Sequence, residues 1–334
     1  MTKFTLSFIS LAMMASVSCA KAQEQAEAET MDTEKVSTVY FTKEITPESL
    51  LAIYRALGVD PSGNVAIKIS TGESEKTGYL RPSFIKPLVD ETHGTIVECN
   101  TAYPGTRNTT EKHLEAIAER GFTDVAKVDI MDAEGDMEIP VADKTHLKYD
   151  IVGSHLANYD FMINLAHFKG HAMGGFGGVL KNASIGVASS RGKVYIHSAG
   201  ASDTEWGHPE QDHFLESMAA AAQGVHDYMQ RKSTKGEPRV IYINVMNKLS
   251  VDCDCNAHPE TPEMKDLGIA ASLDPLALDQ ACLDMVFNHH STPGDDSAAL
   301  IKRINRQHGT HIVDYAATIG LGSQKYDLIN IDLK

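Results

Sequence analysis

Short apolar segments alternate with amphipathic segments along most of the chain. The apolar segments have strand-like length and composition, and they cover residues 36–41, 65–69, 95–100, 127–131, 159–166 and 239–245. The amphipathic segments carry apolar residues at helical spacing and cover residues 46–57, 81–91, 110–120, 213–231, 275–288 and 298–308. Alternation of strand and helix is typical of parallel α/β units. We therefore predict an α/β fold for residues 36–334, a single domain with a mainly parallel or mixed central sheet flanked by helices.

Three further stretches have less regular patterns. Residues 187–197 resemble a β-hairpin turned at Arg191-Gly192. Residues 148–156 predict a short strand or helix, and residues 326–332 predict a last strand. Asp274 precedes Pro275 at the start of a predicted helix, which indicates an N-cap. No internal repeat and no linker rich in Pro or Ser divides the chain after residue 36.

The first 22 residues have the pattern of an export signal. Lys3 precedes an apolar run at residues 4–15, which is too short to span a membrane as a helix. Cys19 follows small residues and resembles a bacterial lipoprotein cleavage site, while residues 20–22 offer an ordinary signal cleavage site instead. We expect an exported protein of the periplasm or cell envelope. A lipid on Cys19 would anchor it to the membrane, and residues 23–35 would form a disordered acidic tether.

Charge and cysteine spacing narrow the function classes. The formal net charge of −15 argues against nucleic-acid binding, and no zinc-finger spacing or basic aromatic segment supports it. Cys253 and Cys255 are separated by one residue, so a disulfide between them would close a strained ring. A metal-ligand or reactive-thiol role is therefore favoured for this pair. Cys282 lies in a predicted helix and is most simply a buried residue. The sequence does not indicate an oligomeric state.

The stretch at residues 164–182 concentrates polar side chains directly after a predicted strand. It contains two histidines, two lysines, two asparagines and five glycines. The glycines predict a loop whose backbone N–H groups can approach an anion, at the end of a strand where open α/β sheets bind ligands. The phosphate-loop motif of nucleotide triphosphatases is absent, because Gly192-Lys193 is followed by Val194. We therefore expect a small anionic ligand that is not a nucleoside triphosphate.

Two histidines and two cysteines are candidate metal ligands: His167, His171, Cys253 and Cys255. The cysteines follow the strand at residues 239–245 and so occupy the same relative place as the glycine-rich stretch. Two thiolates and one or two imidazoles make a site suited to zinc or iron. The alternative is that the histidines only hydrogen-bond the loop backbone.

The metal hypothesis implies a cleft with cationic partners. We predict that Lys169, Lys181 and Arg191 act there as catalytic groups, polarising or binding a small anionic substrate during metal-assisted chemistry. One alternative is a lipoprotein that binds a ligand or metal without catalysis. A further alternative is a redox or electron-transfer protein with a non-standard cluster.

Taken together, these motifs resemble the family known as domain of unknown function 362, over most of residues 36–290. The resemblance is carried by residues 164–171, 177–182, 191–193, 197, 252–255, 266–269 and 272–280. It implies further ligand-binding residues at the positions that match the shared motifs: Asn164, Gly177, Gly178, Asn182, Lys193 and His197. The family name assigns no reaction, so the resemblance predicts the site and not its chemistry.

Many members of that family carry a ferredoxin-like insert with two runs of four cysteines. The insert follows the segment that corresponds to the region of His197 in this chain. In this chain the residues between Ser198 and His213 include no cysteine. We therefore expect no ferredoxin-type 4Fe–4S cluster.

Overall fold

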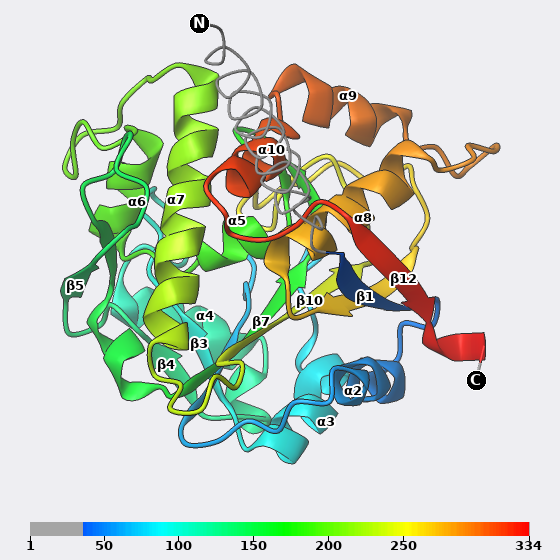
Figure 1. Cartoon of the computed structure of the whole chain (residues 1–334), viewed down its shortest axis with the longest axis horizontal. Helices are drawn as coiled ribbons and strands as arrows, with labels where there is room; N and C mark the ends of the chain where they lie inside the picture. The colour runs from blue at the N-terminus through cyan, green and yellow to red at the C-terminus, as the bar shows by residue number, and fades with distance from the viewer. Residues whose placement is uncertain (1–35, 334) are drawn as a thin grey trace, which may run out of the picture. The chain divides into compact units, whose positions relative to one another are not determined.

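An eight-stranded sheet forms the centre of the protein in the computed structural model, which describes residues 36–333 (Figure 1). The strand order is β12-β1-β11-β10-β7-β2-β3-β4. Their bounds are β1 (Ser37–Thr42), β2 (Val65–Lys68), β3 (Thr95–Glu98), β4 (Val128–Ile130), β7 (Phe161–His167), β10 (Val240–Met246), β11 (Gly268–Ser272) and β12 (Tyr326–Asn330). Strand β11 runs antiparallel to both neighbours, whereas the other pairings are parallel. The predicted α/β class with a mainly parallel, mixed sheet is confirmed.

Helices cover both faces of this sheet. One face packs against α2 (Pro47–Ala56), α3 (Pro82–Thr92) and α4 (Thr110–Glu119). The other face packs against α5 (Val179–Ala183), α7 (Gln211–Gln230) and α8 (Pro275–Phe287). Successive side chains of a strand point to opposite faces, so Ile243 of β10 joins the first layer and Tyr242 joins the second. Burial on both faces explains why the strands read as nearly continuous apolar runs.

Smaller elements surround the sheet. Two short hairpins pair β5 (Asp136–Ile139) with β6 (Asp150–Gly153) and β8 (Lys169–His171) with β9 (Gly175–Gly177). The remaining helices are α6 (Ser190–His197), α9 (Ala298–Arg306) and α10 (His311–Thr318). Single turns of 3-10 helix occur at η1 (Phe122–Asp124), η2 (Ser154–Asn158) and η3 (Ile331–Leu333). The glycine-rich stretch is thus a short hairpin followed by one turn of α-helix, and not a plain loop.

The predicted hairpin at residues 187–197 is wrong, because this segment forms helix α6. The Ser189 side chain accepts a hydrogen bond from the backbone N–H of Gly192 and caps the helix. Gly192 allows a close approach, since a Cβ atom there would lie 1.9 Å from the Ile151 carbonyl oxygen. Residues from Gly192 to His197 are all buried, so the helix has no solvent-exposed face in its second half. A helix that is buried on all sides does not need an alternation of apolar and polar positions, and the sequence therefore lacks the amphipathic pattern that predicts a helix.

The structure agrees with two smaller predictions and does not describe the N-terminal segments. The Asp274 carboxylate accepts hydrogen bonds from the N–H groups of Leu276 and Ala277, as expected of an N-cap. Cys282 is fully buried. The expected signal segment and tether, residues 1–35, lie outside the described residues. None of the described helices is long and apolar enough to cross a membrane.

Candidate metal and anion site

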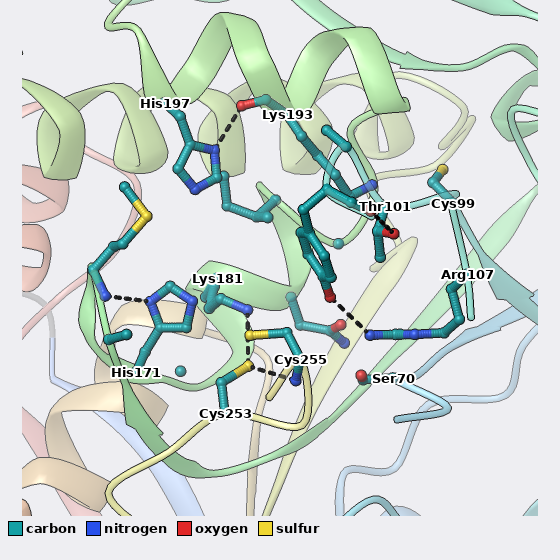
Figure 2. Close-up of a pocket in the computed structure, with 18 of the residues that line it drawn as sticks. Ser70, Cys99, Thr101, Arg107, His171, Lys181, Lys193, His197, Cys253 and Cys255 are labelled. Atoms are coloured by element: carbon teal, nitrogen blue, oxygen red, sulfur yellow. Dashed lines mark hydrogen bonds between the residues drawn. The ribbon is translucent and has the colours of Figure 1, made fainter. Parts of the chain in front are cut away.

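A cavity of about 190 Å³ opens at the carboxyl edge of the parallel strands (Figure 2). Lys68 at the end of β2 and Glu98 at the end of β3 contribute to its lining, and Lys169 lies just beyond β7. The lining contains five cationic side chains and one carboxylate. Ligands of open α/β sheets bind at this edge. The cavity therefore lies where a ligand site was expected, and its lining has a strong excess of positive charge.

A buried carboxylate of α8 positions the glycine-rich stretch. The Asp279 oxygens accept hydrogen bonds from the N–H groups of Val179 and Leu180, at 3.0 and 2.9 Å. Asn244 of β10 donates a third, at 2.7 Å, and burial raises the pKa of Asp279 to about 6. Gly178 permits this contact, since a Cβ atom there would lie 2.2 Å from Asp279 Oδ1. The first N–H groups of α5 are therefore satisfied within the protein, and they are not the anion site that the glycines predicted.

Two asparagines form hydrogen bonds that link the start of α5 to the lining of the cavity. Asn164 donates to the carbonyl oxygen of Val179 at 3.0 Å, and its own oxygen accepts from Asn182 Nδ2 at 2.7 Å. Asn182 lines the cavity together with Gly177 and Gly178. Asn164 lies behind it and is not part of the lining. Of these predicted ligand-binding residues, Asn164 is therefore placed to support Asn182 rather than to touch a ligand.

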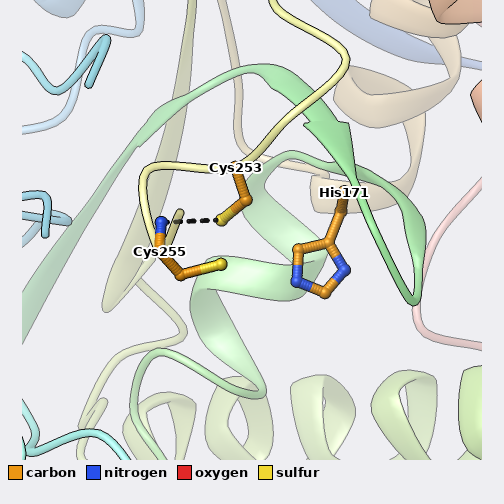
Figure 3. A group of neighbouring side chains, drawn as sticks. All are labelled: His171, Cys253 and Cys255. Atoms are coloured by element: carbon orange, nitrogen blue, oxygen red, sulfur yellow. Dashed lines mark hydrogen bonds between the residues drawn. The ribbon is translucent and has the colours of Figure 1, made fainter. Parts of the chain in front are cut away.

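His171, Cys253 and Cys255 come together on one wall of the cavity (Figure 3). One potential ligand atom from each lies within 4.8 Å of the others. His171 ends β8, and the cysteines lie in the loop after β10. Gly170 brings the two segments together: its N–H donates to the Ser250 carbonyl at 2.8 Å, and a Cβ atom there would lie 2.3 Å from the Val251 oxygen. Segments about eighty residues apart in sequence thus form one three-ligand group.

The two ring nitrogens of His171 have different surroundings. Nδ1 accepts hydrogen bonds from the backbone N–H groups of Gly174 at 2.8 Å and Met173 at 3.3 Å. The other ring nitrogen, Nε2, faces the cysteines (Figure 3). Burial and the nearby Lys181 lower the pKa of His171 well below its usual value, so the ring is neutral and its proton lies on Nε2.

The two thiols differ in acidity. The Cys255 thiol donates to the Cys253 sulfur and, together with Lys181 and Lys169, lowers the pKa of Cys253 well below its usual value. The same hydrogen bond and burial raise the pKa of Cys255. Lys181 Nζ lies 3.6 Å from Cys253 Sγ. The hydrogen bond and the two lysines therefore favour the thiolate at Cys253, and a thiolate is the form that binds metals.

His167 does not join this group. Its Nδ1 lies 3.0 Å from Asp254 Oδ2, and its Nε2 lies 2.6 Å from the carbonyl oxygen of Asn247. Lys169 Nζ is 3.1 Å from the same Asp254 oxygen and also donates to the His167 carbonyl. Although burial opposes it, His167 and Lys169 lower the pKa of Asp254, which is therefore ionised. Both nitrogens of His167 are occupied, so the structure places three and not four of the predicted ligands together.

The cationic side chains of the cavity fall into two sets. Lys169 is paired with Asp254, and Arg107 is paired with Glu73 at 3.0 Å and Glu98 at 3.4 Å. Lys181 donates to the Cys253 sulfur at 3.6 Å, and within residues 36–333 neither Lys68 nor Lys193 forms an ion pair. The two paired side chains belong to the scaffold. Lys68 and Lys193 are available to an anionic ligand, and Lys181 has no carboxylate partner within the same residues.

The remaining predicted residues occupy different places. Lys193 and His197 both line the cavity, and the ring of His197 stacks on Phe214. Arg191 lies in a neighbouring hollow, where it pairs with Asp136 at 2.8 Å and Asp203 at 2.7 Å. It is absent from the lining of the main cavity, so the structure does not bring Arg191 to the other predicted catalytic groups.

Several cavity residues were not predicted from the sequence: Lys68, Glu98, Tyr103, Arg107 and Trp206. Lys68 had a detectable signal, because it stands between Ile67 and Ile69 in an apolar strand where a lysine is unusual. Trp206 is 42% exposed and contacts the His197 ring in a T-shaped arrangement. No local pattern marks Tyr103 or Arg107, which reach the cavity from the loop after β3.

Comparison with known proteins identifies a family but no activity. Residues 65–284 match the family described as Domain of unknown function (DUF362). No curated protein matches the chain significantly. Among solved structures, the lactate racemase apoprotein from Thermoanaerobacterium thermosaccharolyticum is similar with a TM-score of 0.41 and 13% sequence identity. That similarity covers 77% of this chain and 58% of the racemase chain.

Proposed function

The chain belongs to the domain of unknown function 362 family, and since that family name assigns no reaction, we propose a function from the geometry of the site. His171, Cys253 and Cys255 hold a metal ion that faces a cavity for a small anionic ligand. The observation that carries this proposal is the convergence of the three ligand atoms within 4.8 Å on the cavity wall. The sequence motifs point to the same three residues.

The donor set suits a particular kind of metal centre. Two sulfurs and one imidazole nitrogen are soft or borderline ligands that favour zinc or iron over magnesium or calcium. A tetrahedral ion held by three protein ligands keeps one position open, as catalytic zinc sites do, whereas structural sites are closed by a fourth protein ligand. The bound ion would act as a Lewis acid on a ligand in the cavity. This favours metal-assisted chemistry over simple storage.

The unpaired lysines support an anionic ligand. Lys68 and Lys193 are buried, and a buried cation without a counter-ion costs several kcal/mol. A ligand carboxylate or phosphate would supply the missing negative charge to Lys68, Lys181 and Lys193 together. The cavity volume of about 190 Å³ limits this ligand to a small molecule.

A second candidate function is a reactive thiol pair without a metal. The observation that favours it is the hydrogen bonding of His171, whose Nδ1 accepts from Gly174. Metal-bound histidines usually donate a proton from their second nitrogen. Here an ion at Nε2 would displace the ring proton, or the turn at Met173 and Gly174 would have to rearrange. In the thiol alternative, Nε2–H remains a donor facing the thiolate.

Metal analysis of purified protein separates the two candidates. The protein is prepared without chelator or nickel affinity resin, loaded with Zn²⁺ or Co²⁺, and its bound metal is measured by mass spectrometry. We expect one ion per chain and, with Co²⁺, an absorption band typical of thiolate ligands. His171→Ala, Cys253→Ser and Cys255→Ser should each lose most of the bound metal, and binding should weaken as pH falls because protons compete for the ligands.

His167→Gln is the matched control for this experiment. His167 is the second histidine of the same stretch but bonds Asp254 instead of facing the cysteines, so this variant should keep its metal. Background metal content in the wild-type protein, or equal loss in the His167 and His171 variants, would overturn the metal centre. A wild-type protein without metal but with a fast-alkylating Cys253 would support the thiol alternative.

Export and lipid anchoring are part of the same proposal, supported by the signal pattern around Cys19. Cys19→Ser should leave the domain folded and move the protein from the membrane fraction to the soluble fraction. The measurement is fractionation of cells that express either form, with metal content as the test of folding. Membrane association equal to that of the wild type would contradict a lipid on Cys19.

A further inference from the structure

Lys68 is the most deeply buried lysine of the cavity, with no exposed surface. It ends strand β2, and its Nζ donates to the carbonyl oxygen of Ile69 and to Asn182 Oδ1 at 3.1 Å. The orientation of the Asn182 amide follows from its network, because Asn182 Nδ2 donates to the Lys68 carbonyl and to Asn164. Both partners of the Lys68 amine are therefore neutral acceptors. No carboxylate within the described residues forms an ion pair with it.

These surroundings favour the neutral amine. Burial lowers the pKa of Lys68 to about 8, and the nearby Lys193 and Lys181 act in the same direction, against an opposing effect of Glu98. A neutral amine has two N–H bonds, and the two neutral acceptors account for both of them. The lone pair of the Lys68 nitrogen then accepts no hydrogen bond and can act as a nucleophile. A lysine that is desolvated and next to other cations has the environment of a nucleophilic lysine.

We propose that the amine of Lys68 condenses with the carbonyl carbon of a small oxo acid bound in the cavity. The nitrogen lone pair forms the new C–N bond, both amine protons leave with the carbonyl oxygen as one molecule of water, and the product is an imine. No oxidant or further reactant is needed. The ligand carboxylate pairs with Lys181 and Lys193, so the inference rests on the proposed function for anion recognition but does not require the metal.

The combination of groups in the cavity specifies this substrate class. An amine nucleophile requires an electrophilic carbonyl carbon, and the positive charges of Lys181 and Lys193 beside it favour a negative charge on the same molecule. A cavity of about 190 Å³ admits both groups on a short carbon skeleton. An oxo acid is the simplest class of compound that satisfies all three requirements.

Reductive trapping tests the inference. The full chain is incubated at neutral pH with glyoxylate or pyruvate and cyanoborohydride, and the products are analysed by intact mass and peptide mapping. A trapped adduct adds the mass of the acid less one oxygen atom, because reduction turns the imine into a secondary amine. At neutral pH the neutral amine of a lysine with this pKa is about two orders of magnitude more abundant than that of an ordinary lysine. We expect one adduct per chain on the peptide of Lys68.

Two variants and one comparison make the result decisive. Lys68→Met should abolish the stoichiometric adduct, while Lys193→Met removes an equal charge from the cavity and should keep the adduct on Lys68 at a lower yield. Labelling of Lys193 in place of Lys68, or labelling no greater than that of the exposed Lys235, would overturn the inference. Metal content is measured in parallel. Trapping at Lys68 without bound metal would contradict the metal centre alone, and bound metal without trapping would contradict the lysine alone.

Discussion

Two walls of the cavity differ in whether their buried cationic side chains have a carboxylate partner. On the wall of the cysteine loop, Lys169 and His167 share the carboxylate of Asp254, and every charge has a partner. On the wall formed by the end of β2 and by α6, Lys68 and Lys193 bond only neutral oxygens of the protein. Paired charges hold a loop in place, whereas unpaired charges leave free energy available for a ligand. The paired residues therefore stabilise the structure of the site, whereas the unpaired lysines are available to bind the ligand.

Removing the shared carboxylate should have the largest effect on stability. Asp254→Ala leaves Lys169 buried without a counter-ion, so we expect the free energy of unfolding to fall by about 3–5 kcal/mol. Urea denaturation of the wild type and the variant measures it. The double variant Asp254→Ala, Lys169→Met is the control, because it removes both charges and should recover much of the loss. A cost below about 1 kcal/mol for the single variant would show that this wall does not depend on the pair.

Removing the unpaired lysine should have the opposite sign and a smaller size. Lys68 has a pKa of about 8 in the folded state and about 10.5 when unfolded, so below pH 8 the folded state is penalised for holding its proton. Lys68→Met should raise the free energy of unfolding by about 1–2 kcal/mol there, because the pKa difference is worth about 3.4 kcal/mol and the two lost hydrogen bonds cost about 1 kcal/mol each. The gain should shrink between pH 8 and pH 10.5, because there the folded lysine has released its proton while the unfolded lysine still holds one, and it should vanish above pH 10.5.

The control for this variant is Lys235→Met, which removes an exposed lysine and should leave stability unchanged at every pH. Urea denaturation over the same pH range compares the two variants with the wild type. Destabilisation by Lys68→Met below pH 8 would mean that the lysine has a partner in solution, and the contrast between the two walls would then be wrong.

Much of the fold followed from the apolar pattern, and the exceptions have physical causes. The strands of the parallel region and the helices packed on them were predicted because each segment keeps a strand or helix pattern over its whole length. Helix α6 was mistaken for a hairpin because burial on all sides hides its period. The antiparallel strand β11 was not predicted, since its small residues at 268–272 carry no distinctive alternation.

The sequence by itself determined which residue types meet at the carboxyl edge of the sheet, because strand ends in a parallel α/β fold lie on one side and the motifs follow two such ends. It therefore indicated His171, Cys253, Cys255 and the lysines of the glycine-rich stretch. Only the tertiary structure decided that His167 bonds Asp254 while His171 faces the cysteines. It also decided which cations are paired, because pairing depends on side chains brought together from segments far apart in the chain, such as Lys169 and Asp254.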